Sequence, residues 1–88
     1  MEAEAARQWY EGKSPEAAAA FVAELDIAIE SIQTAPELYP PYLYETRRYL
    51  MRRFPYLIVY RTTVAAIQVL AVAHERRRPG YWKTRSTR

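Results

Sequence analysis

The side chains with the clearest chemical potential form one group near the end of the sequence. The group consists of His74, Glu75, Arg76, Arg77, Arg78, Tyr81 and Trp82. Imidazole can exchange a proton near neutral pH, guanidinium groups can hold a phosphodiester, and aromatic rings can stack on a base. Basic side chains from earlier segments are expected beside this group in the fold, namely Arg48, Arg52 or Arg53, and Arg61. Together these are the parts that a metal-independent ribonuclease needs.

A basic patch that binds another protein is a second interpretation of the same group. A single His at the end of a strand is also typical of a structural residue that only forms hydrogen bonds. Other catalytic patterns are missing. The two glycines, Gly12 and Gly80, cannot form a phosphate-binding loop, and one His without any Cys excludes the common zinc sites. We therefore expect no metal and no cofactor.

Charge is distributed unevenly along the chain, whose net charge is +3. Residues 1–44 carry two basic and eight acidic side chains, whereas residues 45–88 carry eleven basic and two acidic ones. Ten of those eleven basic residues are Arg, whose planar fork suits phosphate and carboxylate groups. This asymmetry predicts an acidic partner for the second half. A solvated basic face, or two halves that attract each other on folding, would produce the same pattern.

Length and composition restrict the class of protein. A chain of 88 residues, half of them apolar, is enough for a single globular domain that spans 1–88. No apolar run approaches the roughly 20 residues that cross a bilayer, and the N-terminus is acidic where a signal peptide would be basic. We expect a cytoplasmic protein with no membrane partner. A general nucleic-acid-binding module stays open on charge alone.

Two helices are predicted in the first half. The first spans residues 2–11 and ends before Gly12. Ser14-Pro15-Glu16 is typical of a helix start, with Ser as N-cap, Pro at the first helical position and Glu in the first turn. The second helix extends to about residue 33, before Pro36. Its apolar stripe, at spacings of four, three and four, consists of Phe21, Leu25, Ala28 and Ile32.

Three strands are predicted in the second half, at residues 46–53, 56–61 and 67–73. Phe54-Pro55 marks the first turn, and the second connection, near 63–66, has no readable turn type because it lacks Gly and Asn. The last strand is apolar at nearly every position, so we expect it to be central or covered on both faces. The predicted fold class is α+β, with a helical hairpin packed on a three-stranded antiparallel sheet. Residues 79–88 would form a basic, partly flexible tail.

The order and spacing of several motifs make the sequence similar to the RelE/ParE superfamily of toxins. These motifs are Trp9-Tyr10-Glu11, Phe54-Pro55-Tyr56, Tyr60-Arg61 and His74 followed by Arg77, Tyr81 and Trp82. The superfamily comprises the toxins of bacterial type II toxin–antitoxin modules, often labelled plasmid stabilisation proteins. The resemblance covers nearly the whole chain, and the family fold, a helical hairpin on an antiparallel sheet, agrees with the fold predicted above.

The resemblance implies a small growth-inhibiting toxin that an acidic antitoxin neutralises by wrapping around it, as a hetero-oligomer. Two modes are known in the family. Members that resemble RelE cut mRNA on the ribosome without metal, through basic residues of the sheet and a tyrosine near the C-terminus. Members that resemble ParE poison DNA gyrase and are not nucleases.

One departure from the family pattern concerns the start of the chain. Family members usually begin with a strand before the first helix, whereas this sequence begins inside that helix. The resemblance therefore implies that the sheet lacks its usual first strand, and that the neighbouring strand has unpaired backbone groups. We expect the isolated chain to be poorly stable or to self-associate through that edge, or even to be a degenerate toxin that only binds its antitoxin.

The second departure concerns the residues of the mRNA-cleaving branch. That branch typically has Arg where this chain has Leu57 and where it has Glu75, whereas Arg77 and Tyr81 match it. The run His74-Glu75-Arg76 is closer to the gyrase-poisoning branch. These differences favour a toxin that is not a nuclease.

Roles follow for each candidate residue. In the favoured interpretation, target contact is made by Arg76, Arg77, Tyr81 and Trp82, and antitoxin contact by Arg48, Arg52, Arg53 and Arg61. In the alternative, a ribosome-dependent mRNA endonuclease, the catalytic group would consist of His74, Arg48, Arg52, Arg61, Arg77 and Tyr81.

Overall fold

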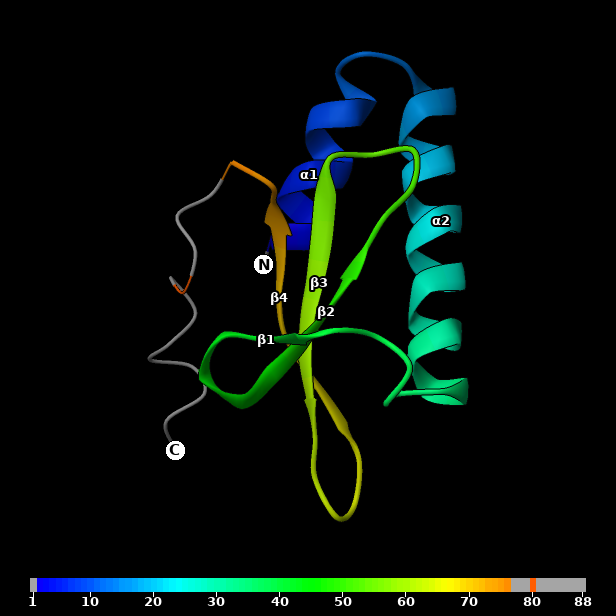
Figure 1. Cartoon of the computed structure of the whole chain (residues 1–88). Helices are drawn as coiled ribbons and strands as arrows, with labels where there is room; N and C mark the ends of the chain where they lie inside the picture. The colour runs from blue at the N-terminus through cyan, green and yellow to red at the C-terminus, as the bar shows by residue number, and fades with distance from the viewer. Residues whose placement is uncertain (1, 77–79, 81–88) are drawn as a thin grey trace.

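Two helices lead into a four-stranded antiparallel sheet (Figure 1). The computed structural model describes residues 2–76 and 80. Its elements are α1 (Glu2–Glu11), α2 (Pro15–Thr34), β1 (Pro41–Tyr42), a 3₁₀ turn (Leu43–Glu45), β2 (Thr46–Leu50), β3 (Tyr56–Thr62) and β4 (Ile67–His74). The strands lie in the order β1-β2-β3-β4. The predicted α+β class is confirmed, but the predicted number of three strands is wrong.

Local sequence explains the helical hairpin. The Ser14 hydroxyl oxygen accepts a hydrogen bond of 3.0 Å from the Ala17 N–H, and Pro15 occupies the first helical position, as predicted. The predicted stripe of α2 is confirmed as well, because Phe21, Ala28 and Ile32 are buried and Leu25 packs beside them. No described helix is long and apolar enough to cross a membrane.

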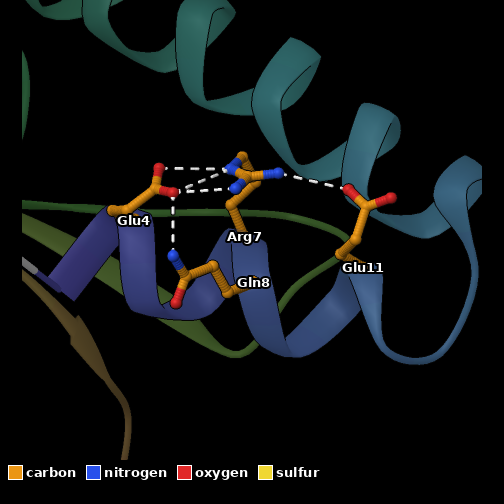
Figure 2. A network of polar contacts seen from close by, with 4 residues as sticks. All are labelled: Glu4, Arg7, Gln8 and Glu11. Atoms are coloured by element: carbon orange, nitrogen blue, oxygen red, sulfur yellow. Dashed lines mark hydrogen bonds and ion pairs between the residues drawn. The ribbon is translucent and has the colours of Figure 1, made fainter.

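Surface ion pairs stabilise α1 along its exposed side (Figure 2). Arg7 contacts Glu4 at 2.7 Å and Glu11 at 3.1 Å, and Gln8 donates to the same Glu4 carboxylate. These hydrogen bonds from Arg7 hold the pKa of Glu4 below its ordinary value. Such exposed pairs at i,i+3 and i,i+4 spacing contribute a few tenths of a kcal/mol each. The Arg7 guanidinium group is therefore paired with carboxylates of its own helix.

The sheet has one face toward the helices and one face away from them. On the helix-facing side, Ile58, Tyr60 and Val72 form a core with Ala28 and Ile32 of α2. The outer face carries a second buried cluster, which consists of Leu57, Val59, Leu70, Ala71 and Ala73, with Tyr42 packed against it. Directly opposed residues of an antiparallel pair share a face, so the strand registers assign the remaining side chains to one face or the other.

A β-bulge interrupts β4. Val59 pairs with Ala71 and Tyr60 pairs with Val69, which leaves Leu70 as an extra residue. Up to the bulge, Gln68 lies on the outer face opposite Arg61. Beyond it, alternation is shifted by one residue, so that Leu70 and Ala71 belong to the same outer cluster. Every residue of β4 after the bulge is therefore on the opposite face from the one that strict alternation would give.

Three details of the predicted sheet need correction. β1 is a two-residue strand that pairs Pro41 with Arg47 and Tyr42 with Thr46, in a segment too short to show alternation. β2 ends at Leu50 rather than at residue 53, because the chain turns there. β4 is an edge strand of the described sheet and not a central one, whereas the other alternative, a strand covered on both faces, holds for residues 70–73, which are all buried.

Candidate functional site

Two of the candidate arginines lie together on the outer face of the sheet. Arg48 is opposite Val59, and Arg61 lies two residues further along β3 on the same side. Such diagonal neighbours are about 7–8 Å apart. The guanidinium group of Arg48 lies 5.1 Å from the centre of the Tyr42 ring, and that of Arg61 donates a 2.8 Å hydrogen bond to Gln68. Two of the four arginines of the predicted antitoxin surface therefore share one face of the sheet.

His74 lies on the other face. It pairs with Tyr56 at the end of β4, and the two ring centres are 5.2 Å apart. The pocket around it has a volume of about 510 Å³ and is lined by Ala5, Ala6, Trp9, Tyr10, Pro55, Tyr56 and Val72. None of these lining residues is basic. Nδ1 of His74 accepts a 3.1 Å hydrogen bond from the Arg76 N–H, so the neutral ring carries its proton on Nε2.

The bulge at Leu70 is the reason for this separation. His74 follows Gln68 by six positions, an even number, so strict alternation would have placed His74 on the face of Arg61. The extra residue turns it toward α1 instead. His74 pairs with Tyr56, which lies five residues before Arg61 on β3. Five residues of a strand correspond to roughly 16 Å. The described residues therefore do not bring His74 together with Arg48 and Arg61.

Arg52 and Arg53 lie in the turn between β2 and β3. Their backbone N–H groups donate to the carboxylate of Glu24 on α2 at 3.2–3.3 Å, which fixes this turn against the helix. Both residues are exposed. Arg76 is exposed beyond the end of β4. The other candidates, Arg77, Tyr81 and Trp82, lie outside the described residues.

A groove separates α2 from β2. It has a volume of about 660 Å³ and is lined by Glu24, Ile27, Ser31, Tyr39, Pro40, Arg48, Tyr49, Leu50 and Arg52. Ile27 and Leu50 are 59% and 52% exposed, which is high for aliphatic side chains on a described helix and strand. The groove therefore combines two arginines from the predicted antitoxin surface with two solvated apolar side chains.

Comparison with known families decides the class of protein. A family model described as the ParE toxin of the type II toxin–antitoxin system parDE matches residues 2–79 of the chain. The chain belongs to this family. No curated protein and no solved structure gives a significant match. The resemblance predicted from the sequence is confirmed, and membership of the ParE toxin family implies an antitoxin as partner.

In this ParE family toxin, the residues of the groove that sequence reasoning missed are Ile27, Leu50 and Glu24. Ile27 lies off the buried stripe of α2, and an exposed Leu50 alternates with Arg48 and Arg52. Both were visible as apolar residues at positions where a solvated face would carry polar ones. Nothing in the sequence indicated the role of Glu24, because glutamate is common on helix surfaces.

One arginine of the basic half serves the fold of this ParE family member. The guanidinium group of Arg47 donates hydrogen bonds to the carbonyl oxygens of Tyr39 at 2.6 Å and Glu37 at 3.4 Å. It thereby ties the segment after α2 to β2.

In the part of the chain that the structure describes, no group of three or more His, Asp or Glu could hold a metal ion.

Proposed function

We propose that this toxin inhibits growth by binding DNA gyrase, and that an acidic antitoxin neutralises it. The observation that carries the choice of gyrase over mRNA is the separation of His74 from the arginines. A nuclease needs its proton-transfer group and its phosphate-binding groups around one scissile bond, within hydrogen-bond distance of the reacting atoms. Here His74, the last residue of β4, faces α1 on the helix-facing side, while Arg48 and Arg61 lie on the outer face.

Two further residues support a binding role. The mRNA-cleaving branch that the sequence resembles typically has Arg where this chain has Leu57 and Glu75. Leu57 is only 7% exposed and belongs to the outer apolar cluster, so this position offers no cation to a phosphate. Glu75 is exposed and negatively charged next to His74, which would repel a phosphodiester there.

Target contact is assigned to the segment that follows β4. Arg76 is exposed at the start of that segment, and the sequence adds Arg77, Tyr81 and Trp82. We expect the double variant Arg76→Ala, Arg77→Ala to lose toxicity while it still binds the antitoxin. A matched pair exists in Arg52→Ala, Arg53→Ala, which removes the same charge from the turn between β2 and β3. That control should remain toxic but should be neutralised less completely.

Pulse-labelling after induction of the chain in bacteria without its antitoxin tests the target. DNA synthesis that fails first, with a DNA-damage response, supports gyrase. Protein synthesis that fails first contradicts gyrase and supports the endonuclease alternative, in which His74→Gln would abolish activity. Unchanged growth contradicts the toxin role and leaves a chain that only binds its antitoxin.

The charge of the chain supports an acidic antitoxin. The described candidates for this contact are Arg48, Arg52, Arg53 and Arg61, and all four lie on β2, on β3 or in the turn between them. Association that depends on such exposed charges weakens as salt rises, because the Debye length falls from about 10 Å at 0.1 M to about 3 Å at 1 M. A complex whose association rate is independent of salt would contradict an electrostatic partner.

A further inference from the structure

The groove between α2 and β2 has an open strand edge along one wall. Directly after β2, the Met51 N–H bonds to the Tyr56 carbonyl of β3, whereas within β2 the Arg48 N–H bonds to the Pro40 carbonyl on the other side. Because N–H groups alternate in direction along a strand, that of Leu50 points away from β3, like that of Arg48. Its carbonyl oxygen points the same way. Leu50 therefore presents one donor and one acceptor to the groove.

Two obstacles limit how far a partner could pair along this edge. At one end, the Pro40 carbonyl already occupies the Arg48 N–H. At the other end, the Glu24 carboxylate accepts from the Arg52 and Arg53 N–H groups. Only Leu50 lies between them with both backbone groups directed outward. The edge has room for one residue that exchanges both backbone hydrogen bonds with Leu50, together with its immediate neighbours.

Side chains of opposite character line the two sides of this edge. Toward α2 lie Ile27, Tyr39 and Tyr49, with the two tyrosine rings 5.0 Å apart in an edge-to-face contact. Arg48, two residues before Leu50, shares its face of the strand, and Arg52, two residues after it, also lines the groove. The negative charge of Glu24 is directed to the turn by its hydrogen bonds and marks one end of the groove. An occupant therefore meets apolar surface on one side and positive charge on the other.

We infer that this groove binds a short extended segment of an acidic partner protein, which adds to β2 as an antiparallel strand at Leu50. Successive side chains of a strand point to opposite faces. The partner residue opposite Leu50 shares its face and lies between Arg48 and Arg52, so it is Asp or Glu. Its two neighbours point toward Ile27 and the tyrosines, so they are apolar. The recognised pattern is apolar–acidic–apolar.

This inference rests on the proposed function for the identity of the partner, since an antitoxin is the acidic protein that the chain is expected to meet. Two observations on the groove support it independently of that identity. Charge complementarity selects an acidic occupant, and the solvated Ile27 and Leu50 side chains gain from being covered. Backbone pairing with an exposed edge is a common way to bind an extended peptide.

Titration of the isotope-labelled chain with a capped peptide, Ser-Thr-Val-Glu-Val-Thr-Ser, tests the groove by NMR. We expect the largest shifts at the Leu50 amide and at the Ile27 methyl groups. A peptide methylated on the backbone nitrogen of its glutamate cannot donate to the Leu50 carbonyl, so it should bind at least tenfold more weakly. Replacement of that glutamate by lysine should also abolish binding. Equal binding of the methylated peptide would overturn the strand-addition mode.

Two matched pairs of variants complete the test. Arg52→Glu should weaken peptide binding about tenfold, whereas Lys13→Glu, an equal charge reversal between α1 and α2 and outside the groove lining, should change it less than twofold. Ile27→Asp should abolish binding, whereas Val22→Asp, also on α2 and outside the lining, should not. All four side chains are at least partly exposed, so these variants keep the fold.

Several results would overturn the inference. They are shifts centred on β4, equal losses within either matched pair, or no shift at millimolar peptide. Shifts at Leu50 that grow with protein concentration in the absence of peptide would instead indicate a second copy of the chain as occupant. None of these measurements uses growth. Failure of peptide binding with intact toxicity therefore contradicts only the groove, whereas loss of toxicity with intact peptide binding contradicts only the proposed function.

Discussion

Glu24 joins the two halves of the fold, and its removal should destabilise the protein measurably. Its two carboxylate oxygens accept hydrogen bonds from the backbone N–H groups of Arg52 and Arg53, at 3.2–3.3 Å. These residues follow Glu24 in the sequence by 28 and 29 positions. The bonds therefore hold the turn between β2 and β3 against α2. Glu24→Ala removes them without disturbing the buried stripe of the helix.

The expected loss is about 1 kcal/mol in the free energy of unfolding. A hydrogen bond to a charged group contributes about 1.5–3 kcal/mol when it is shielded from water. Here the distances are at the long end of the range for N–H···O bonds, and Arg52 and Arg53 are exposed, so that water can replace the lost acceptor. A loss of about 1 kcal/mol lowers the melting temperature of a domain of this size by about 4–8 °C.

Urea unfolding followed by circular dichroism measures this loss, with Glu30→Ala as the control. Glu30 is exposed on the same helix, and its carboxylate makes no hydrogen bond within the described residues. The gain in helix propensity from Glu to Ala is the same in both variants and cancels. Glu24→Gln keeps one oxygen acceptor and should lose about half as much. Equal midpoints for Glu24→Ala and Glu30→Ala would refute the link between α2 and the turn.

Three further predictions concern stability and association. Phe21 is fully buried against Tyr10 and other rings, so Phe21→Ala should lower the free energy of unfolding by about 3–5 kcal/mol. A urea titration should find little folded protein for Phe21→Ala, whereas Phe21→Leu should remain folded. Burial raises the pKa of the Tyr60 phenol above 10.0, so the unfolded state ionises first and the free energy of unfolding should fall as pH rises above about 10. Identical dependence of this free energy on pH for the wild type and Tyr60→Phe would contradict this. The β4 edge has neither charge nor proline, so light scattering should detect self-association of the chain, and Val69→Lys should reduce it. A monomer that unfolds cooperatively would contradict self-association.

Sequence patterns predicted those elements whose signals are local. Both helices begin and end within one residue of the predicted positions, because Ser14-Pro15 and Pro36 act on their own neighbours and the stripe of α2 repeats over about three turns. The turn near 63–66 lacked the usual glycine or asparagine. There the Thr63 hydroxyl oxygen accepts hydrogen bonds from the Ala65 and Ala66 N–H groups, a local substitute that these residue types permit but do not require.

Features that depend on pairing between strands were not predictable. β1 exists only because Pro41 and Tyr42 meet β2 across a tight turn, where Tyr44 and Glu45 both have positive φ. Such strain is maintained by the surrounding fold and leaves no trace in composition. The grouping of His74 with the arginines assumed uninterrupted alternation, and one residue of register is enough to reverse a face.

The bulge at Leu70 also has a genetic consequence. Loss of the single codon for Leu70 would remove only the bulge, because Val69 and Ala71 already pair with the adjacent residues Tyr60 and Val59 of β3. His74 would stay opposite Tyr56. Loss of the codon for Ala73 would instead move His74 to the position opposite Leu57, on the face of Arg61, and the ring contact with Tyr56 would be lost. Nuclear Overhauser contacts of the His74 ring would distinguish the two deletion variants. A histidine facing the helices and one facing the arginines are thus separated by one in-frame deletion.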